Sequence, residues 1–306
     1  MNNYYYGTGR VRSLEARMLA PDQVERMAAA ADFESAFGVL PETSYADHLP
    51  KLKHAFDFEE LLELEEKSLK DLIKKLAPED EIIAALLKKH DYLNWKILLR
   101  SSLSENKEIE DFPDKDLFAV VTKAYEEEKD PQVIDFILDK HYFAYLKKVC
   151  QASPSLLIKN MVNYQIDLIN IKTLVRAQRL KKDKKFLAKA LLEPGLIGKD
   201  TLLNLLDSSF QDISLRLNYT EYFPKIAGGF AKLAESGSAF LLEKQMDDFI
   251  IGQFRKAKYL SSGVEPIVGF YLAKEAEMKT IRFILISQSN YIGSEQIKER
   301  LRISYV

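Results

Sequence analysis

Apolar residues recur at three- and four-residue steps along most of the chain, which is the spacing of one face of an α-helix. In segment 56–78 this pattern stops at Pro78, so a helix is expected to end there. A second helical pattern begins at Pro131, which suits a first helical turn. A third runs over 155–192 and stops at Glu193-Pro194-Gly195. The alternation typical of strands is nearly absent, so the pattern predicts an all-α protein.

Breaks between the predicted helices are short. They fall at Pro41, Pro50, Pro113, Gly228-Gly229, Ser236-Gly237-Ser238 and Ser261-Ser262-Gly263. The 306 residues include only 12 glycines and 10 prolines, which fits helices joined by short turns. A chain of this length is expected to form two or three domains.

A ten-residue motif occurs twice. DYLNWKILLR, from Asp91, and DLINIKTLVR, from Asp167, share the pattern D-x-x-N-x-K-x-L-x-R. In KEAEMKTIRF, Lys279 and Ile281 take the lysine and leucine places, and RVRSLEARML, from Arg10, is a further echo. The repeat predicts about three related helical domains, with the terminal segments completing one of them together. The expected domains are 1–55 plus 265–306, 56–150, and 151–264.

The shared asparagine and lysine of the motif are two residues apart, so they do not share a helix face. They are interpreted as end-of-helix and surface positions with a structural role, in preference to a binding role.

Composition narrows the class of protein. The formal charge is -2, without the basic excess of a dedicated nucleic-acid binder. A lone cysteine, Cys150, excludes an internal disulfide and a cysteine-based zinc site, and its apolar surroundings predict that it is buried. The start has no signal-peptide pattern, and no window is apolar enough to cross a membrane. We expect a soluble, intracellular protein, with any membrane association made through a partner.

The sequence contains no recognisable active-site motif. Gly7 and Gly9 lack the third glycine of a dinucleotide fingerprint, and Gly198-Lys199 has no P-loop glycine or hydroxyl at the required spacing, so Gly195 and Gly198 are predicted to be turn residues. No two histidines have the i, i+4 spacing of a helical metal site. The dense carboxylates of one amphipathic helix are interpreted as a solvated face and not as acid–base catalysts: Glu59, Glu60, Glu63, Glu65 and Glu66. The sequence therefore predicts no catalysis, no cofactor and no metal.

Charge is unevenly distributed along the chain. Segment 171–190 has eight basic residues and one acidic residue, whereas segment 56–81 has ten acidic residues and four lysines. Such segments can orient protein partners, although each can also be an ordinary solvated helix. The candidate partner contacts are Lys181, Lys182 and Lys185.

The two ends of the chain carry a family pattern. Tyr6-Gly7-Thr8-Gly9-Arg10-Val11-Arg12-Ser13-Leu14, leading to Met18-Leu19, resembles the opening of the C subunit of the V-type and archaeal-type rotary ATPases, which is named d in eukaryotes. The end resembles the closing segment of that family at Tyr271, Lys274, Glu275, Glu277, Lys279, Ile281-Arg282, Ile284, Ile297, Glu299-Arg300-Leu301 and Tyr305-Val306. Thr8-Gly9 and Ser287-Gln288 depart from the usual residues.

The resemblance implies a funnel-shaped protein of three similar helical domains. It would have no catalysis of its own, would bind the D and F subunits of the central stalk and the membrane ring of proteolipid subunits, and would transmit torque for H+ or Na+ transport. It would be peripheral on the cytoplasmic face of the membrane, in one copy per complex. The alternatives are a helical-repeat scaffold that binds other proteins and, less simply, a helical enzyme.

The resemblance also suggests a role for the last residues. We expect the closing segment to pack against RVRSLEARML and complete the first domain, with Val306 near the end of a helix. Basic residues Lys298, Arg300 and Arg302 would then lie in the last helical turns, where the helix dipole favours positive charge.

Overall fold

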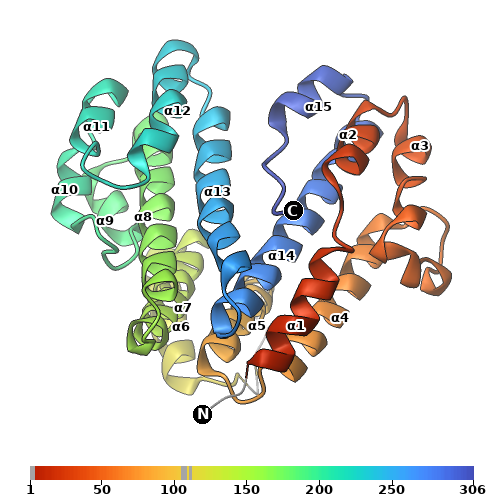
Figure 1. Cartoon of the computed structure of the whole chain (residues 1–306). Helices are drawn as coiled ribbons and strands as arrows, with labels where there is room; N and C mark the ends of the chain where they lie inside the picture. Colours follow the sequence, from red (N-terminus) through yellow and green to blue (C-terminus); the bar gives the residue numbers. More distant parts are fainter. Residues whose placement is uncertain (1–3, 105–108, 110–111) are drawn as a thin grey trace. The chain divides into compact units, whose positions relative to one another are not determined.

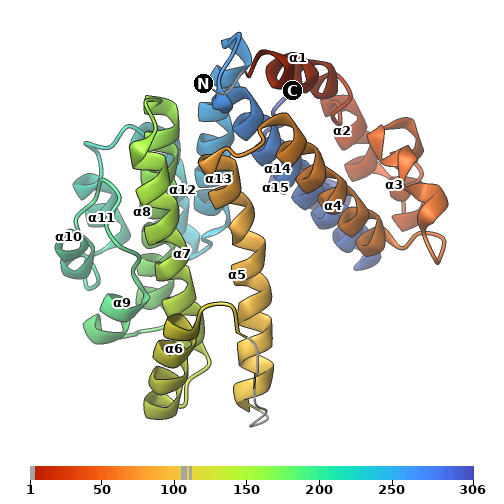
Figure 2. The same cartoon turned by 90° about the horizontal axis from the view of Figure 1, so that it is seen from below.

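The computed structural model describes residues 4–104, 109 and 112–306, and these residues form two compact units (Figures 1 and 2). Unit 1 combines Met1–Ile83 with Phe210–Val306, and unit 2 is the continuous segment Ala84–Ser209. The described residues are helical or irregular and include no strand, so the all-α prediction is confirmed. The arrangement of three similar domains in a funnel stays a prediction.

Unit 1 is built from two stretches of helices that are far apart in the sequence. Its first stretch contains α1 (Tyr5–Glu15), α2 (Pro21–Ala29), α3 (Phe33–Phe37), the 3-10 turns η1 (Leu40–Glu42), η2 (Ser44–Asp47) and η3 (Leu49–Lys51), and α4 (Phe58–Leu76). Its second stretch contains α11 (Phe210–Arg216), α12 (Phe223–Ser236), α13 (Phe240–Arg255), η4 (Lys256–Tyr259), α14 (Val264–Ser289) and α15 (Ser294–Arg300).

Unit 2 contains α6 (Lys115–Glu128), α7 (Gln132–Ala152), α8 (Leu156–Arg179), α9 (Lys184–Ala190) and α10 (Lys199–Asn204). Helix α5 (Glu81–Ser104) begins in unit 1 and continues into unit 2. Cys150, on α7, is buried as predicted.

The core of unit 1 lies around α14, which packs against α1, α3, α4 and α13 (Figures 1 and 2). Most of its 26 residues are buried, because neighbours cover it on several sides. This explains why its sequence is apolar around much of the helix instead of along one stripe. Helix α4 is amphipathic. Asp57 caps its N-terminus, because the Asp57 side chain accepts a hydrogen bond from the Glu60 amide. The helix ends before Pro78, as predicted.

The predicted helix over 155–192 is interrupted. Helix α8 ends at Arg179, Lys181 takes a left-handed backbone conformation with φ 51°, and Asp183 starts α9 by accepting a hydrogen bond from the Phe186 amide at 2.7 Å. The expectation of one continuous helix was wrong because Asp183 caps a new helix inside a lysine-rich run.

The same turn occurs between α14 and α15 of unit 1. The Lys182 amide donates to the Ala177 carbonyl at 2.9 Å, and the Ile292 amide donates to the Ser287 carbonyl at 3.0 Å. Tyr291 has the left-handed conformation of Lys181, with φ 56°. Each residue of the unit 1 turn lies 110 positions after its counterpart in unit 2. This offset aligns Lys172 of the motif with Arg282, whereas the sequence comparison had aligned the motif lysine with Lys279.

Matching polar contacts extend the similarity beyond the turn. Gln178 donates to the carbonyls of Leu206 and Ser208 in unit 2, and Gln288 donates to those of Ala28 and Ala30 in unit 1. Helix α10 therefore corresponds to α2. In unit 2, α10 comes after α9 in the sequence, whereas in unit 1, α2 comes from the other end of the chain and packs against α15. This agrees with the expectation that segments from the two ends of the chain pack together.

In the second copy of the ten-residue motif, which starts at Asp167, two polar residues hold loops in place. The buried Asp167 carboxylate accepts from the amides of Leu196 and Ile197, and Asn170 bonds both the amide and the carbonyl of Leu192. In this copy the aspartate and asparagine have a structural role, as expected. However, Asn170 is a buried residue in the middle of α8, so its assignment to an end-of-helix or surface position was wrong.

Candidate functional site

The predicted partner contacts lie at the turn between α8 and α9. Lys181, Lys182 and Lys185 are all exposed, and the Lys182 ammonium lies 4.9 Å from the ring centroid of Phe186. The geometry of this turn is fixed by the Asp183 cap and by the hydrogen bonds of Gln178 described above. The three ammonium groups are therefore presented on a defined turn of the backbone, and we refer to it as the basic turn.

Two lysines beside the basic turn form ion pairs with acidic residues, unlike the three lysines of the turn. Lys189 forms an ion pair with Glu128 at 2.8 Å, and Lys184 lies 3.9 Å from Asp207. Among the described residues, no carboxylate pairs with Lys181, Lys182 or Lys185. Their charge is available to attract an acidic surface, with a strength that salt reduces.

Gly195 and Gly198, the residues resembling a P-loop, form a turn as predicted. A Cβ on Gly195 would lie 2.5 Å from the Asn163 carbonyl oxygen and 2.5 Å from Oδ1 of Asp167, so only glycine fits there. Gly198 is the N-cap of α10, and a Cβ there would meet only the Thr201 hydroxyl at 3.8 Å. Gly195 therefore allows the turn to pack closely against α8, whereas Gly198 has room for a side chain.

The largest concentration of buried charge is in unit 1. The Lys274 ammonium lies 2.6 Å from Glu277 and 2.7 Å from Glu65, and Tyr45 donates to Glu277 at 2.9 Å. His48 is hydrogen bonded to the other oxygen of Glu65 at 2.8 Å. The other oxygen of Glu277 accepts from the Leu19 amide at 2.6 Å. We call these residues the buried polar cluster.

The electrostatics of the cluster favour a fixed, structural arrangement. Burial alone would lower the pKa of Lys274, but the carboxylates of Glu277 and Glu65 outweigh it and raise the pKa above its ordinary value. Burial, together with the Glu277 and Glu65 charges, also raises the pKa of Tyr45 well above its ordinary range. Lys274 stays charged and Tyr45 stays protonated, and each has a partner in the protein. The cluster ties η2, α4 and α14 to the segment that precedes α2.

The closing residues, 301–306, lie across unit 1 without helical structure, and we call them the strap. Tyr305 is buried, its hydroxyl donates to Oε1 of Glu15 at 3.1 Å, and Glu15 in turn accepts two hydrogen bonds from Arg12. Lys258 donates to the Tyr305 carbonyl at 3.1 Å. The strap thus packs against RVRSLEARML as expected.

One part of that expectation was wrong. Helix α15 ends at Arg300, and residues 301–306 are extended, so Val306 is not near the end of a helix. Lys298 and Arg300 lie in the last turn of α15 as expected, but Arg302 lies beyond it and pairs with Asp247 at 3.3 Å. Backbone contacts to α13 replace helical ones: the Ile303 amide donates to Asp248 at 2.8 Å.

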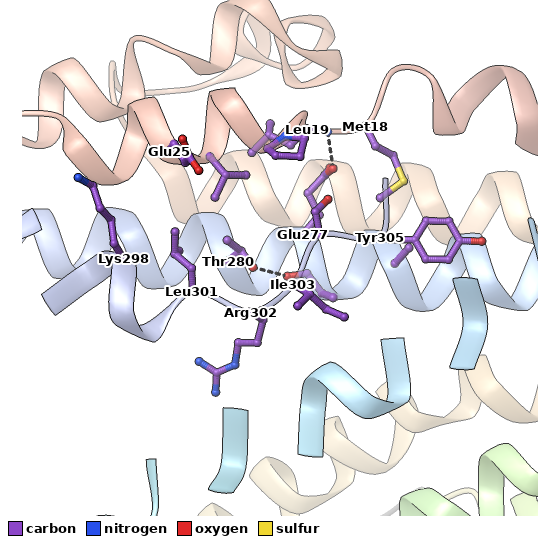
Figure 3. Close-up of a pocket in the computed structure, with 15 residues that line it drawn as sticks. Met18, Leu19, Glu25, Glu277, Thr280, Lys298, Leu301, Arg302, Ile303 and Tyr305 are labelled. Carbon is purple, nitrogen blue, oxygen red and sulfur yellow. Dashed lines mark hydrogen bonds between the residues drawn. The ribbon is translucent and has the colours of Figure 1, made fainter. Parts of the chain in front are cut away.

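A cavity of about 480 Å³ lies beneath the strap (Figure 3). Helix α14 lines one side with the small side chains Ala273, Ala276 and Thr280. Lys298 and Glu25 lie at one end, and Tyr305 lies at the other with its ring pointing out of the cavity (Figure 3). Glu277 reaches the cavity wall, but both of its oxygens are already hydrogen bonded within the cluster. The cavity brings no free acid–base pair together.

Within 4–104, 109 and 112–306, no group of three histidine, cysteine or acidic side chains is placed to hold a metal ion. Across that same part of the chain, every helix is too short or too polar to serve as a membrane span.

These features define an all-helical protein whose conspicuous polar residues hold its helices and termini together. The model for the family described as ATP synthase (C/AC39) subunit matches residues 8–118 and 113–300, and the chain therefore belongs to this family. The resemblance found in the terminal motifs is confirmed.

Curated relatives are similar over nearly their whole length. The C subunit of the V-type sodium ATPase of Enterococcus hirae is 26% identical, with 96% of this chain and 97% of the relative aligned. The C subunits of the A-type ATP synthases of Methanocaldococcus jannaschii and Pyrococcus abyssi are each 22% identical, with 97% of this chain aligned to 86% and 89% of theirs.

The family motifs coincide with the contacts that close unit 1. Lys274, Glu277, Tyr305 and Arg12 belong both to the resemblance and to the cluster or the strap. Sequence reasoning missed the roles of Tyr45, His48 and Glu65, because their partners lie about 200 residues away or in a different helix. Glu65 was counted with a solvated face, yet it is buried. A signal for it was its position on the leucine side of α4.

Proposed function

We propose that this chain is the non-catalytic coupling subunit in the rotor of a V-type or A-type ATPase or ATP synthase. In this role it links the central stalk, built from the D and F subunits, to the membrane ring of proteolipid subunits. It transmits torque between them, so that ATP hydrolysis or synthesis is coupled to the transport of H+ or Na+. One copy lies at the cytoplasmic face of the membrane and is held there by its partners.

The observation that carries this proposal is the match to C subunits over almost the entire length of both chains. Two features of the molecule support it. A torque-transmitting part needs stiffness, and unit 1 has a buried ion-pair cluster and a strap that connect its two sequence segments. It also needs partner surfaces, and the basic turn offers unpaired positive charge on a fixed backbone. Lys181, Lys182 and Lys185 are proposed to contact an acidic partner surface.

The proposal is tested by mixing the chain with the D–F pair from the same organism, and separately with the detergent-solubilised proteolipid ring. Size-exclusion chromatography with light scattering measures the mass of each product. We expect one copy of the chain per D–F pair and one per ring. Separate peaks with both partners would contradict the proposal and favour a helical scaffold for other proteins.

A further inference from the structure

The second copy of the ten-residue motif, on α8, binds the backbone of a loop. The Asp167 carboxylate accepts hydrogen bonds from two successive amides of the loop 191–198. Asn170 binds both backbone groups of Leu192, donating to its carbonyl and accepting from its amide. Because the aspartate and the asparagine are three positions apart, they lie on one face of the helix. Together they hold the loop that leads into α10.

Helix α14 uses an acidic residue at the same place for the same purpose. The offset of 110 positions puts Glu277 where α8 has Asp167, and the Glu277 carboxylate accepts from the Leu19 amide at 2.6 Å. Leu19 precedes α2, the helix that corresponds to α10. A carboxylate suits this task, since hydrogen bonds to charged groups are stronger than those between neutral groups. In both helices the acidic residue holds the backbone that leads into a short helix.

Helix α5 carries the first copy of the motif, and its matching face is uncovered. The offset of 76 positions makes Asp91 the counterpart of Asp167 and Asn94 the counterpart of Asn170. Asp91 and Asn94 are exposed, whereas their counterparts are buried. Leu98, one turn further along the same face, is 42% exposed, whereas the matching leucine of α8 has no exposed surface. We call Asp91, Asn94 and Leu98 the α5 face.

The described part of the chain makes no use of the two polar side chains of this face. Within it, neither Asp91 nor Asn94 has a hydrogen-bond or ion-pair partner. The next helix, α6, has a cap of its own, because the Asp114 side chain accepts from the Leu117 amide at 2.9 Å. Helix α6 packs against α7. The α5 face therefore has the acceptors of a backbone-binding site without the loop that fills the equivalent site of α8.

We propose that the α5 face is a docking site for a loop of a partner protein that is built like residues 191–204 of this chain. The partner loop offers two successive backbone amides to Asp91 and an amide and a carbonyl to Asn94, and it leads into a short helix. It is also aliphatic, because Leu191, Leu192 and Ile197 of the loop in unit 2 are all buried and because Leu98 needs an apolar cover.

The partner loop must also have a glycine where it passes the carboxylate. In unit 2, a Cβ on Gly195 would lie 2.5 Å from Oδ1 of Asp167 and 2.5 Å from the Asn163 carbonyl oxygen. The α5 face has the corresponding carboxylate in Asp91, and Leu87 provides the corresponding carbonyl group. A loop that binds in the same way therefore has no room for a side chain at this point.

This inference goes beyond the proposed function. It specifies the chemistry of the bound segment, and it does not depend on the complex to which the partner belongs. Its test accordingly needs neither the stalk nor the ring.

The probe is a fluorescent peptide with the sequence of residues 189–204, KALLEPGLIGKDTLLN, which has the required features. Fluorescence polarisation measures its binding to the full chain. We expect saturable binding that becomes at least about tenfold weaker when Asp91→Ala and Asn94→Ala are combined, because the amides of the peptide lose a charged acceptor. The matched control combines Asp71→Ala with Asn218→Ala, at two exposed positions of unit 1, and should bind as the unchanged chain does.

A changed peptide tests whether the geometry is that of unit 2. The peptide with Gly195→Ala should bind the unchanged chain at least about tenfold more weakly, because its new Cβ meets the carboxylate and the carbonyl group. Equal binding of the two peptides would contradict the proposed site. Absence of binding, or binding that the combined Asp91→Ala and Asn94→Ala changes leave as it was, would also overturn the inference.

Thermal unfolding separates docking from a role in the fold. Asp91→Ala should unfold at the same temperature as the unchanged chain, whereas Asp167→Ala should unfold at a lower one, because buried loop amides lose their acceptor. Equal destabilisation by the two changes would show that Asp91 is used within the chain, and the inference would fall. None of these results bears on the coupling role, which is tested with the D–F pair and the ring.

Discussion

The Tyr305 hydroxyl donates a hydrogen bond to the Glu15 carboxylate at 3.1 Å, across 290 positions of sequence. Arg12 holds the same carboxylate with two hydrogen bonds and also reaches the carbonyl oxygens of Ala257 and Leu260. Three places in the chain are thus joined: Tyr305 and Arg12 both bind the Glu15 carboxylate, and Arg12 connects it to residues 257–260.

Replacing Tyr305 by phenylalanine should lower the free energy of unfolding by about 1–2 kcal/mol, because a buried acceptor loses a donor. Burial and then the Glu15 charge raise the pKa of Tyr305 above that of an unfolded tyrosine. Above about pH 10 the unfolded chain releases this proton while the folded chain retains it, so stability falls as the pH rises. The fall should be shallower in Tyr305→Phe. Urea unfolding at pH 8, 10 and 11 measures both effects.

The control for that experiment is Tyr259→Phe, since Tyr259 is 90% exposed. Its stability should match that of the unchanged chain at each pH. If Tyr305→Phe lost stability above pH 10 as steeply as the unchanged chain, the phenol would not be the titrating group, and the slope would belong to other buried groups such as Tyr45.

Replacing Glu277 by glutamine should destabilise unit 1 by about 3–5 kcal/mol, because one partner of a buried ion pair is removed and Lys274 keeps only Glu65. Chemical denaturation followed by circular dichroism measures the loss. Glu295→Gln is the matched change on an exposed pair with Lys298 and should stay within about 0.5 kcal/mol of the original. Equal effects of the two substitutions would show that the cluster contributes no more than a surface pair.

Adding a methyl group to Gly195 should disturb unit 2, because the new Cβ would meet a backbone oxygen and the Asp167 carboxylate at 2.5 Å. We expect a loss of about 2–3 kcal/mol for Gly195→Ala. Gly198→Ala, three residues away with its nearest contact at 3.8 Å, should be nearly neutral. Faster hydrogen exchange around residues 191–198 in the first variant alone would confirm that the turn is held by this approach; equal exchange in both would contradict it.

Reversing the charge of the basic turn, with Lys181, Lys182 and Lys185 all changed to glutamate, should weaken partner binding and remove most of its dependence on salt. Titration calorimetry against the D–F pair and the solubilised ring, at low and high salt, measures the change. Reversal of three exposed lysines elsewhere, Lys67, Lys123 and Lys225, alters net charge equally and serves as the control. Undiminished binding of the first variant would remove the basic turn from the interface.

Local signals in the sequence were enough for most helices. Pro78 ends α4 and Pro131 precedes α7, because a proline limits its neighbours wherever it lies in the fold. The break after α8 was harder to see: Lys181 adopts a conformation usually taken by glycine, and the Asp183 cap stands among lysines. The turn at Tyr291 has the same backbone conformation with a different sequence. Both turns are held by hydrogen bonds from a preceding glutamine, Gln178 or Gln288, to distant carbonyl groups.

For the candidate site, too, some features could be predicted from the sequence and others depended on contacts formed by folding. Terminal motifs identified the family, and the placement of Tyr305 against the first helix followed from it. The partners of Asn170 and Glu65 could not be predicted from local periodicity, since each depends on a loop or helix brought alongside by folding. The course of residues 301–306 likewise depends on distant partners: Asp247 and Asp248 of α13 bind Arg302 and the Ile303 amide, and Glu15 binds Tyr305.

The divided sequence of unit 1 has a consequence for synthesis. Helices α1 to α4 leave the ribosome before α14 has been made, so the helix that buries them is absent for on the order of ten seconds. Unit 2 is continuous and can fold in that interval. The Leu19 amide and Glu15 can meet Glu277 and Tyr305 only after those two residues have been made, so helices α1 to α4 are secured late. A chain cut short before α14 would leave them exposed to chaperones and proteases.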